Sequence, residues 1–147
     1  MKMFERILLA TDFSPASMPA FDQAVRLARQ EGASLLIAHV SQDVVAAELG
    51  YAPPAVYDEW EQKLRAGIER KLEPMVDRAR KEGVAADLRL LTGYADEAIV
   101  EAARRERADL IVMGTHGRRG ASRLLLGSVA ARVVATAPCP VLTVRPA

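Results

Sequence analysis

The sequence predicts an α/β fold, a single doubly wound domain in which four helices flank a five-stranded parallel sheet. Five short apolar runs of strand length alternate along the chain with four segments whose apolar residues have helical spacing. Strands separated by helices favour parallel pairing through right-handed crossovers. The length of 147 residues fits one domain, residues 1–147, and leaves little room for a second.

The predicted strands differ in their patterning. Four of them are continuous apolar runs, which is typical of strands buried on both faces of a sheet. The third alternates instead, with Asp87 and Arg89 on one face and Leu88 and Leu90 on the other, which indicates an edge strand. In chain order, the predicted strands cover residues 7–10, 34–40, 85–91, 109–113 and 141–144.

The first two predicted helices have clear boundaries. Ser14 is a capping residue followed by proline, which predicts a helix start, and Gly32 predicts the end of that helix. The second helix covers residues 57–82 and carries an apolar stripe that begins with Trp60 and Leu64.

The last two predicted helices are shorter. One carries apolar residues from Ala95 to Ala102, and the other begins near Ser128 and stops before Pro138. Residues 41–55 contain Gly50, Pro53 and Pro54 and are expected to form a loop longer than most connections.

The charge is unevenly distributed, although the formal net charge is only +1. Residues 1–109 have a balance of −4, whereas residues 110–147 carry five arginines and no carboxylate, a balance of +5. A carboxylate-free segment can attract an anion, and a basic solvated face would give the same count.

Cysteine content and hydropathy exclude several classes of protein. The single cysteine, Cys139, cannot form an internal disulfide. No apolar run approaches the roughly 18 residues of a membrane span, and charged residues occupy the place of a signal peptide's apolar stretch. We therefore expect a cytoplasmic protein that has no membrane partner.

Polar residues follow the first predicted strand at the edge where such sheets bind ligands. Thr11 and Asp12 come directly after this strand. The Asp12 carboxylate could accept hydrogen bonds from a ligand or bind a metal, and the alternative is that it caps the following helix.

A glycine-rich segment follows the fourth predicted strand. Gly114, Gly117 and the pair Gly127-Ser128 form the pattern G-x2-G-x9-G-S, and Gly120 lies between them. Glycines allow backbone N–H groups to approach an anion, and a helix N-terminus adds unpaired donors and the positive end of its dipole. The pattern favours a phosphate-binding loop over a flexible surface loop with a routine helix cap. No Walker A motif is present, and no G-x-G-x-x-G follows the first strand.

These motifs together resemble the ATP-binding branch of the universal stress protein family. The resemblance covers essentially the whole chain and rests on four segments: residues 7–14, 109–120, 127–128 and 137–144. It implies an adenine nucleotide alpha-hydrolase-like fold with strand order 3-2-1-4-5. It also implies ATP as the ligand, with Mg²⁺ or Mn²⁺ bridging phosphate oxygens, and a homodimer that pairs through Val141, Leu142, Thr143 and Val144.

The resemblance also implies a role for individual residues. Asp12 would bind at the ribose or adenine end, the Val40 backbone would meet adenine, and Met113 and Gly114 would line the base and sugar. The phosphates would be held by residues around Gly117 and at the start of the last helix. The full set implied for the nucleotide site is Thr11, Asp12, Val40, Met113, Gly114, Thr115, His116, Gly117, Arg118, Gly120, Gly127, Ser128 and Val129.

Two functions remain open at this point. A regulatory stress protein would bind ATP with negligible catalysis, whereas a slow ATPase or nucleotide hydrolase would use the same site with Asp12 positioning a metal or water. His116 could contact ribose or phosphate, or lie exposed. A response-regulator receiver is disfavoured because the third predicted strand lacks a phosphoacceptor aspartate. Nucleic-acid binding is disfavoured because aromatic residues are few.

Overall fold

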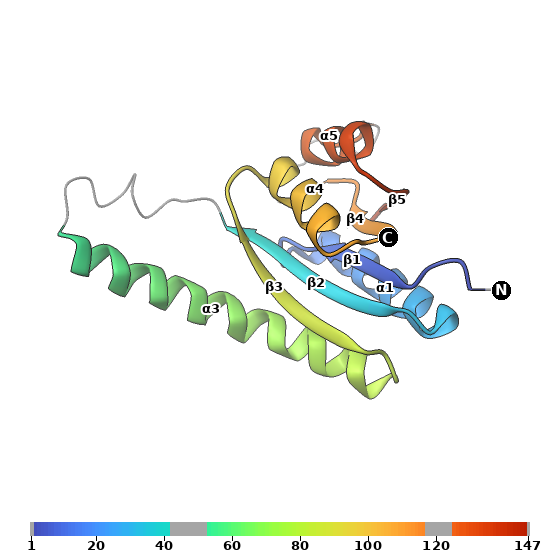
Figure 1. The fold of residues 1–147 in the computed structure, drawn as a ribbon, viewed down its shortest axis with the longest axis horizontal. Helices are drawn as coiled ribbons and strands as arrows, with labels where there is room; N and C mark the ends of the chain where they lie inside the picture. The colour runs from blue at the N-terminus through green and yellow to red at the C-terminus, as the bar shows by residue number, and fades with distance from the viewer. Residues whose placement is uncertain (1, 42–52, 117–124, 147) are drawn as a thin grey trace.

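The protein forms one parallel five-stranded sheet with helices on both faces (Figure 1). The structure is a computed structural model that describes residues 2–41, 53–116 and 125–146. Neighbouring strands follow the order β3-β2-β1-β4-β5, so the predicted strand order is confirmed. The strands are β1 (Arg6–Ala10), β2 (Ser34–Ser41), β3 (Ala86–Thr92), β4 (Leu110–Gly114) and β5 (Val141–Val144).

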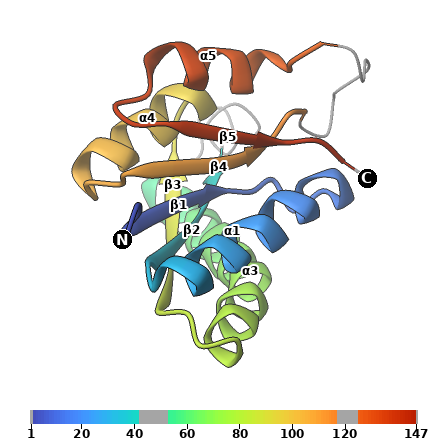
Figure 2. The same cartoon turned by 90° about the vertical axis from the view of Figure 1, so that its right-hand side faces the viewer.

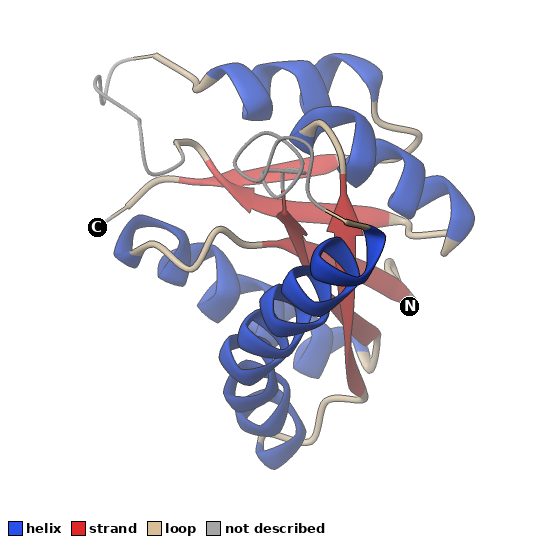
Figure 3. Ribbon diagram, turned by 90° about the vertical axis from the view of Figure 1, so that its left-hand side faces the viewer, coloured by secondary structure: helices blue, strands red, loops and turns tan. Residues whose placement is uncertain are grey.

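The helices divide into two layers (Figures 2 and 3). On one face, α1 (Met18–Glu31) and α3 (Pro54–Lys81) pack against a core that contains Phe21 and Leu72. On the other face, α4 (Ala95–Arg105) and α5 (Ser128–Thr136) cover a second core that contains Ile111. Among the described residues, no helix combines the length and the apolar character that crossing a membrane requires.

Central strands are buried on both faces because their side chains alternate between these two cores. In β1, Ile7 and Leu9 belong to the α1 and α3 core, and Leu8 belongs to the α4 and α5 core. The register pairs Leu8 with Leu36 of β2 on one side and with Ile111 of β4 on the other. The outer strand β3 is half-solvated, as its alternating sequence predicts.

The structure corrects several predicted boundaries. The turn after Ser14 is a 3₁₀ helix, η1 (Pro15–Ser17), and α1 begins only at Met18. Ser14 caps η1 by accepting a hydrogen bond from the Ser17 N–H. The predicted loop of residues 41–55 is wrong at both ends, because β2 includes Ser41 and α3 begins at Pro54, and residues 42–52 lie outside the described residues.

The first turns of α3 also differ from the prediction. Trp60 and Leu64 continue the apolar stripe in sequence, yet their side chains are 51% and 39% exposed. The buried part of α3 runs from Ile68 to Ala79. The start of this helix therefore extends beyond the sheet that its second half covers (Figure 1).

Candidate functional site

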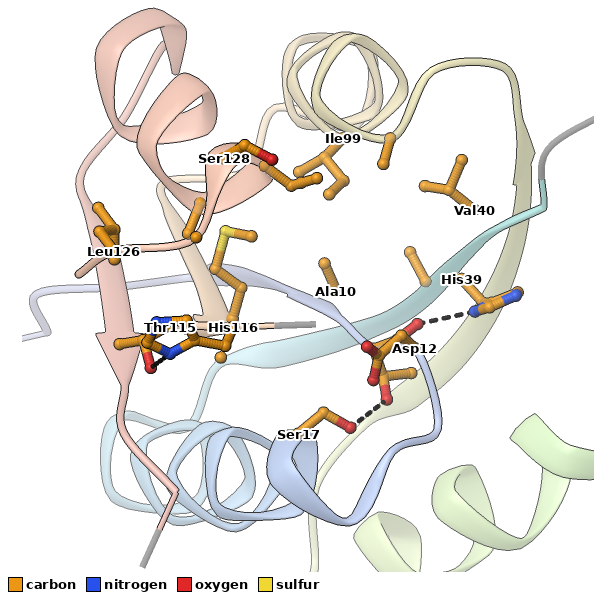
Figure 4. A pocket seen from close by; sticks show the side chains of 18 of the residues that line it. Ala10, Asp12, Ser17, His39, Val40, Ile99, Thr115, His116, Leu126 and Ser128 are labelled. Atoms are coloured by element: carbon orange, nitrogen blue, oxygen red, sulfur yellow. Dashed lines mark hydrogen bonds between the residues drawn. The ribbon is translucent and has the colours of Figure 1, made fainter. Parts of the chain in front are cut away.

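A pocket of about 600 Å³ opens at the carboxyl ends of β1, β2 and β4 (Figure 4). The first turns of α4 and α5 close it from the opposite side. Strand order reverses between β1 and its two neighbours, which is where sheets of this type bind ligands. The lining residues are Ala10, Thr11, Asp12, Ser17, Ala38, His39, Val40, Ala95, Ile99, Met113, Gly114, Thr115, His116, Leu125, Leu126, Gly127, Ser128, Val129 and Ala130.

The turn after β1 presents Asp12 to the pocket. Phe13 has a φ of 65°, a left-handed conformation that is unusual for a residue with a side chain. The Phe13 N–H donates to Thr11 Oγ1 at 3.1 Å, and the Ser14 N–H donates to Asp12 Oδ1 at 2.9 Å. The carboxylate therefore stabilises the turn before η1, whereas the capping role considered for Asp12 belongs to Ser14, and Asp12 also lines the pocket.

Buried hydroxyl groups hold this turn against α1. Thr11 Oγ1 lies 3.2 Å from Ser17 Oγ, and Ser17 Oγ donates to the Ser14 carbonyl at 2.8 Å. All three of these residues are buried. Because buried polar groups are costly to leave unpaired, this network fixes the position of Asp12.

His39 forms the neighbouring wall at the end of β2. Its Nδ1 lies 2.8 Å from the Thr11 carbonyl oxygen. A carbonyl oxygen can only accept, so Nδ1 must carry the proton. The imidazole ring also packs on Phe13 with ring centroids 4.4 Å apart. His39 is therefore a packed, polar residue of the pocket lining.

The N-terminus of α5 closes the pocket on the side of β4. The Gly127 N–H donates to the Thr115 carbonyl at 2.8 Å, which ties the helix start to the end of β4. A Cβ at Gly127 would lie only 2.9 Å from that carbonyl oxygen, so the contact requires glycine. The N–H groups of Ser128, Val129 and Ala130 begin the helix and have no carbonyl partner within it. The positive end of the helix dipole therefore lies at the pocket wall.

His116 contributes a ring nitrogen whose hydrogen bonding is incomplete. Its Nδ1 lies 2.9 Å from Thr115 Oγ1. Its Nε2 is buried and has no hydrogen-bond partner among the described residues. Leaving such an atom unpaired costs about 1–3 kcal/mol, and His116 is one of the residues that line the pocket.

The rest of the pocket is apolar, and its polar groups are few. Val40, Ile99 and Met113 supply aliphatic surface to its lining. Among the described lining residues, Asp12 is the only carboxylate. No group of three His, Cys, Asp or Glu side chains within residues 2–41, 53–116 and 125–146 is arranged to hold a metal ion.

Comparison with known proteins identifies the family. The family model described as the universal stress protein family matches residues 3–145. A universal stress protein of Thermus aquaticus is 40% identical over 146 residues, covering 97% of this chain and all of that protein. The universal stress protein MJ0531 of Methanocaldococcus jannaschii is 34% identical, covering 97% of this chain and 83% of that protein.

The chain belongs to the universal stress protein family. Its fold agrees with that of protein MJ0577 from the same archaeon, with a TM-score of 0.86, 26% identity and coverage of 99% and 98% of the two chains. This agreement confirms the predicted adenine nucleotide alpha-hydrolase-like fold. A universal stress protein solved in complex with cAMP is 28% identical, with a TM-score of 0.72 and coverage of 98% of both chains.

In this universal stress protein, the sequence-predicted residues that the structure describes gather around one pocket. Three others, Gly117, Arg118 and Gly120, lie outside the described residues. The described members of the predicted set that line this pocket are Thr11, Asp12, Val40, Met113, Gly114, Thr115, His116, Gly127, Ser128 and Val129.

The sequence did not predict the part of the pocket that α4 supplies. Ala95 and Ile99 line the wall opposite β1, four residues apart on one face of α4. This spacing was visible in the sequence, and the helix after β3 must begin at the carboxyl edge of the sheet. Leu125 and Leu126 were also missed, and nothing in their local pattern distinguishes them from other loop residues.

Proposed function

We propose that this protein is a regulatory module that binds ATP or a closely related adenine nucleotide in the pocket at the carboxyl edge of the sheet. The observation that carries the proposal is the convergence of the Asp12 turn, the end of β4 and the start of α5 on one cavity. The related structure in complex with cAMP supports an adenine nucleotide as the ligand class.

The base and sugar fit the half of the pocket built by β2, β4 and α4. Val40, Ile99 and Met113 provide aliphatic surface for a planar ring. The backbone of Val40, which continues β2 towards Ser41, can hydrogen-bond the polar edge of adenine. Asp12 accepts hydrogen bonds, and the ribose hydroxyl groups are donors of the matching kind. We assign the nucleoside to this half.

The phosphates fit the other half. The first-turn N–H groups of α5 and the Ser128 hydroxyl are donors, and the helix dipole favours negative charge. The motif G-x2-G-x9-G-S, which ends at Gly127-Ser128, is the feature of the ATP-binding branch that we assign to this role. Gly117 and Arg118 belong to the same proposed phosphate loop. His116 Nε2 has no hydrogen-bond partner among the described residues, and we assign a phosphate or ribose oxygen to it.

A divalent ion in this proposal is held chiefly by the nucleotide. The described residues provide no cluster of three ligating side chains, and the pocket has one described carboxylate, Asp12. Mg²⁺ commonly retains several waters and binds through phosphate oxygens with one or two carboxylates. We therefore place Mg²⁺ or Mn²⁺ on the phosphates, with the ion arriving as part of the metal–nucleotide complex.

Binding without rapid turnover is the form of the function that we favour over a slow ATPase. The described titratable groups in the wall are Asp12, His39 and His116, and each is engaged in a local hydrogen bond. Hydrolysis requires a positioned water as well as charge stabilisation. Phosphate release that exceeds the buffer rate and disappears in Asp12→Ala, with nucleotide binding retained, would establish the ATPase instead.

Isothermal titration with Mg-ATP at high micromolar protein tests the proposal. Ser128→Ala removes one hydroxyl donor from the phosphate half, and Thr136→Ala removes a hydroxyl from the last turn of the same helix as a control. A hydrogen bond to a charged group contributes about 1.5–3 kcal/mol, so we expect Ser128→Ala to weaken binding at least about tenfold. Thr136→Ala should bind like the parent protein. An absence of heat from the parent protein would contradict the proposal.

We also propose that two copies associate through β5. This strand is at the end of the sheet order and its Leu142 side chain is 37% exposed. Val134 on the adjacent α5 is 50% exposed. An outer strand with exposed aliphatic residues is suited to pairing with a second copy.

A further inference from the structure

A second concave surface lies at the opposite edge of the sheet, where the strands begin. This groove has a volume of about 650 Å³ and is bordered by the starts of β1, β2 and β3 and by the C-terminal end of α4. It shares no lining residue with the pocket at the carboxyl edge. Its lining residues are Arg6, Ile7, Leu8, Ser34, Leu35, Leu36, Arg80, Ala85, Ala86, Asp87, Arg89, Arg105, Glu106, Arg107 and Ala108.

The groove is strongly cationic, with five arginines and two carboxylates in its lining. One arginine engages both carboxylates: Arg89 Nε lies 2.9 Å from Glu106 Oε1, and Arg89 Nη1 lies 3.3 Å from Asp87 Oδ2. The bond to Glu106 raises the pKa of Arg89. A backbone hydrogen bond from Leu88, helped by Arg89, lowers the pKa of Asp87. Both carboxylates are therefore already paired with Arg89.

The other four arginines of the groove form no ion pair with a described residue, and one of them, Arg80, donates a hydrogen bond from Nε to the Ala86 carbonyl oxygen at 3.0 Å. These four, Arg6, Arg80, Arg105 and Arg107, are exposed. Asp109 lies nearby, but its oxygens accept hydrogen bonds from the backbone N–H groups of Glu5 and Arg6.

Arg107 has an unusual backbone conformation for its residue type. Two hydrogen bonds end α4, from the Ala108 N–H to the Ala103 carbonyl and from the Arg107 N–H to the Arg104 carbonyl. This is a Schellman motif, and Arg107 occupies its left-handed position with a φ of 54°. Helix α3 ends with the same pair of bonds and has Gly83 at that position, with a φ of 85°.

Glycine is the favoured residue at this position because it has no Cβ to clash there. The chain uses it at α3, and Gly32 at the end of α1 is also left-handed. At the end of α4, Arg107 occupies the left-handed position instead of glycine, and its cationic side chain lines the groove. A side chain retained in a costly conformation points to a function for that side chain. The carbonyl groups at the end of α4 accept these hydrogen bonds, which weakens the negative end of the helix dipole beside the groove.

We infer that the groove at the amino edge binds a small, multiply charged, phosphate-bearing anion. Guanidinium groups match phosphate oxygens in pairs, and unpaired arginines around one concavity suit a ligand with several charges. No aromatic residue occurs among the lining residues, so the groove offers no stacking surface for nucleic-acid bases. Its separation from the nucleotide pocket makes this a second, independent anion site.

Titration with inorganic triphosphate, followed by amide chemical shifts, tests this inference. We expect saturable shifts at Ser34, Asp87 and Ala108 that persist when an equal ionic strength of sodium chloride is present. Shifts confined to the start of α5, no groove shifts at millimolar triphosphate, or equal shifts from sodium chloride alone would overturn the inference. Tighter binding of a hexaglutamate peptide than of triphosphate would overturn the phosphate assignment.

Two variants and a matched control sharpen the test. Arg105→Gln and Arg107→Gly each remove a groove cation, and each should weaken triphosphate binding by about tenfold, the effect of one charge-assisted contact. Arg104→Gln removes an exposed arginine of the same helix that does not line the groove, and it should change the affinity by less than about twofold. Arg107→Gly also relieves the left-handed strain, so its midpoint of thermal unfolding should rise while its affinity falls. Equal affinities of all three variants would contradict the inference.

Discussion

Replacing Gly127 by alanine tests the close contact that positions the start of α5. The added Cβ would lie 2.9 Å from the Thr115 carbonyl oxygen, whereas ordinary contact begins at 3.4 Å, so the two must separate by about 0.5 Å. The same carbonyl accepts the 2.8 Å hydrogen bond from the Gly127 N–H, so separation also weakens that bond. Gly127 has φ −60° and ψ 156°, which alanine adopts freely, so backbone strain contributes nothing.

The expected magnitude follows from two opposing effects. Overpacking against a fixed backbone costs about 1–3 kcal/mol, and loss of glycine freedom in the unfolded chain returns about 0.4–1 kcal/mol. We therefore expect Gly127→Ala to lower the free energy of unfolding by about 1–2 kcal/mol. Gly67→Ala is the matched control, because a Cβ at Gly67 in α3 meets no atom within 4 Å. It should raise the free energy of unfolding by about 0.5–1 kcal/mol.

Equilibrium urea unfolding of the three proteins measures both effects. The midpoints should move in opposite directions while the slopes stay equal, which identifies changes in stability alone. A Gly127→Ala protein as stable as the parent would refute the assigned contact between the α5 start and the Thr115 carbonyl. A destabilised Gly67→Ala protein would refute the open environment assigned to α3.

Three further predictions concern the core, the thiol and the outer strand. Leu72→Ala removes a fully buried side chain beneath the sheet and should lower the free energy of unfolding by about 2–5 kcal/mol in the same urea assay; a loss below 1 kcal/mol would contradict its burial. Burial raises the pKa of the Cys139 thiol, so less thiolate is present at pH 8, and iodoacetamide should react more slowly with the native protein than with the urea-unfolded chain. Equal rates would contradict that environment. Leu142→Lys places a charge on the exposed edge of β5 and should shift sedimentation from dimer to monomer, whereas an unchanged dimer would place the interface elsewhere.

Much of the fold could be predicted from the sequence because burial on two faces leaves a simple pattern. The side chains of the continuous apolar run Ile7, Leu8 and Leu9 point alternately into the two cores on either face of the sheet. The mixed polar and apolar pattern around Arg89 is typical of an outer strand. Boundaries were less predictable. Ser14 and Pro15 look like a helix start, yet a 3₁₀ turn intervenes because Ser17 bonds back to Ser14.

Long-range geometry limited the prediction in two other places. Trp60 continues a helical stripe, but the stripe is longer than the sheet that it could cover, and no local pattern shows where that support ends. The positive φ values of Phe13 and Arg107 were equally invisible, since neither residue type favours this conformation.

The candidate site was predicted where function depends on local motifs. Asp12 directly follows a strand and Gly127-Ser128 begins a helix, so neighbouring residues in the sequence were enough to single them out. All three residues line the pocket. Ile99 and His39 enter the pocket because of how α4 and β2 pack, which depends on the whole sheet. The amino-edge groove lay outside the prediction for the same reason, because its arginines come from β1, α3, β3, α4 and the turn after α4.

Nucleotide binding at the carboxyl-edge pocket is tested by titration of the protein with Mg-ATP, followed residue by residue through backbone amide shifts. Binding there predicts saturable shifts at Val40, Gly114, Ser128 and Val129, which line opposite walls of the pocket. It also predicts that adenosine alone shifts Val40 and Gly114 more strongly than Ser128 and Val129, because it lacks the phosphates. An absence of shifts at millimolar ATP, or shifts confined to residues away from this pocket, would contradict the claim.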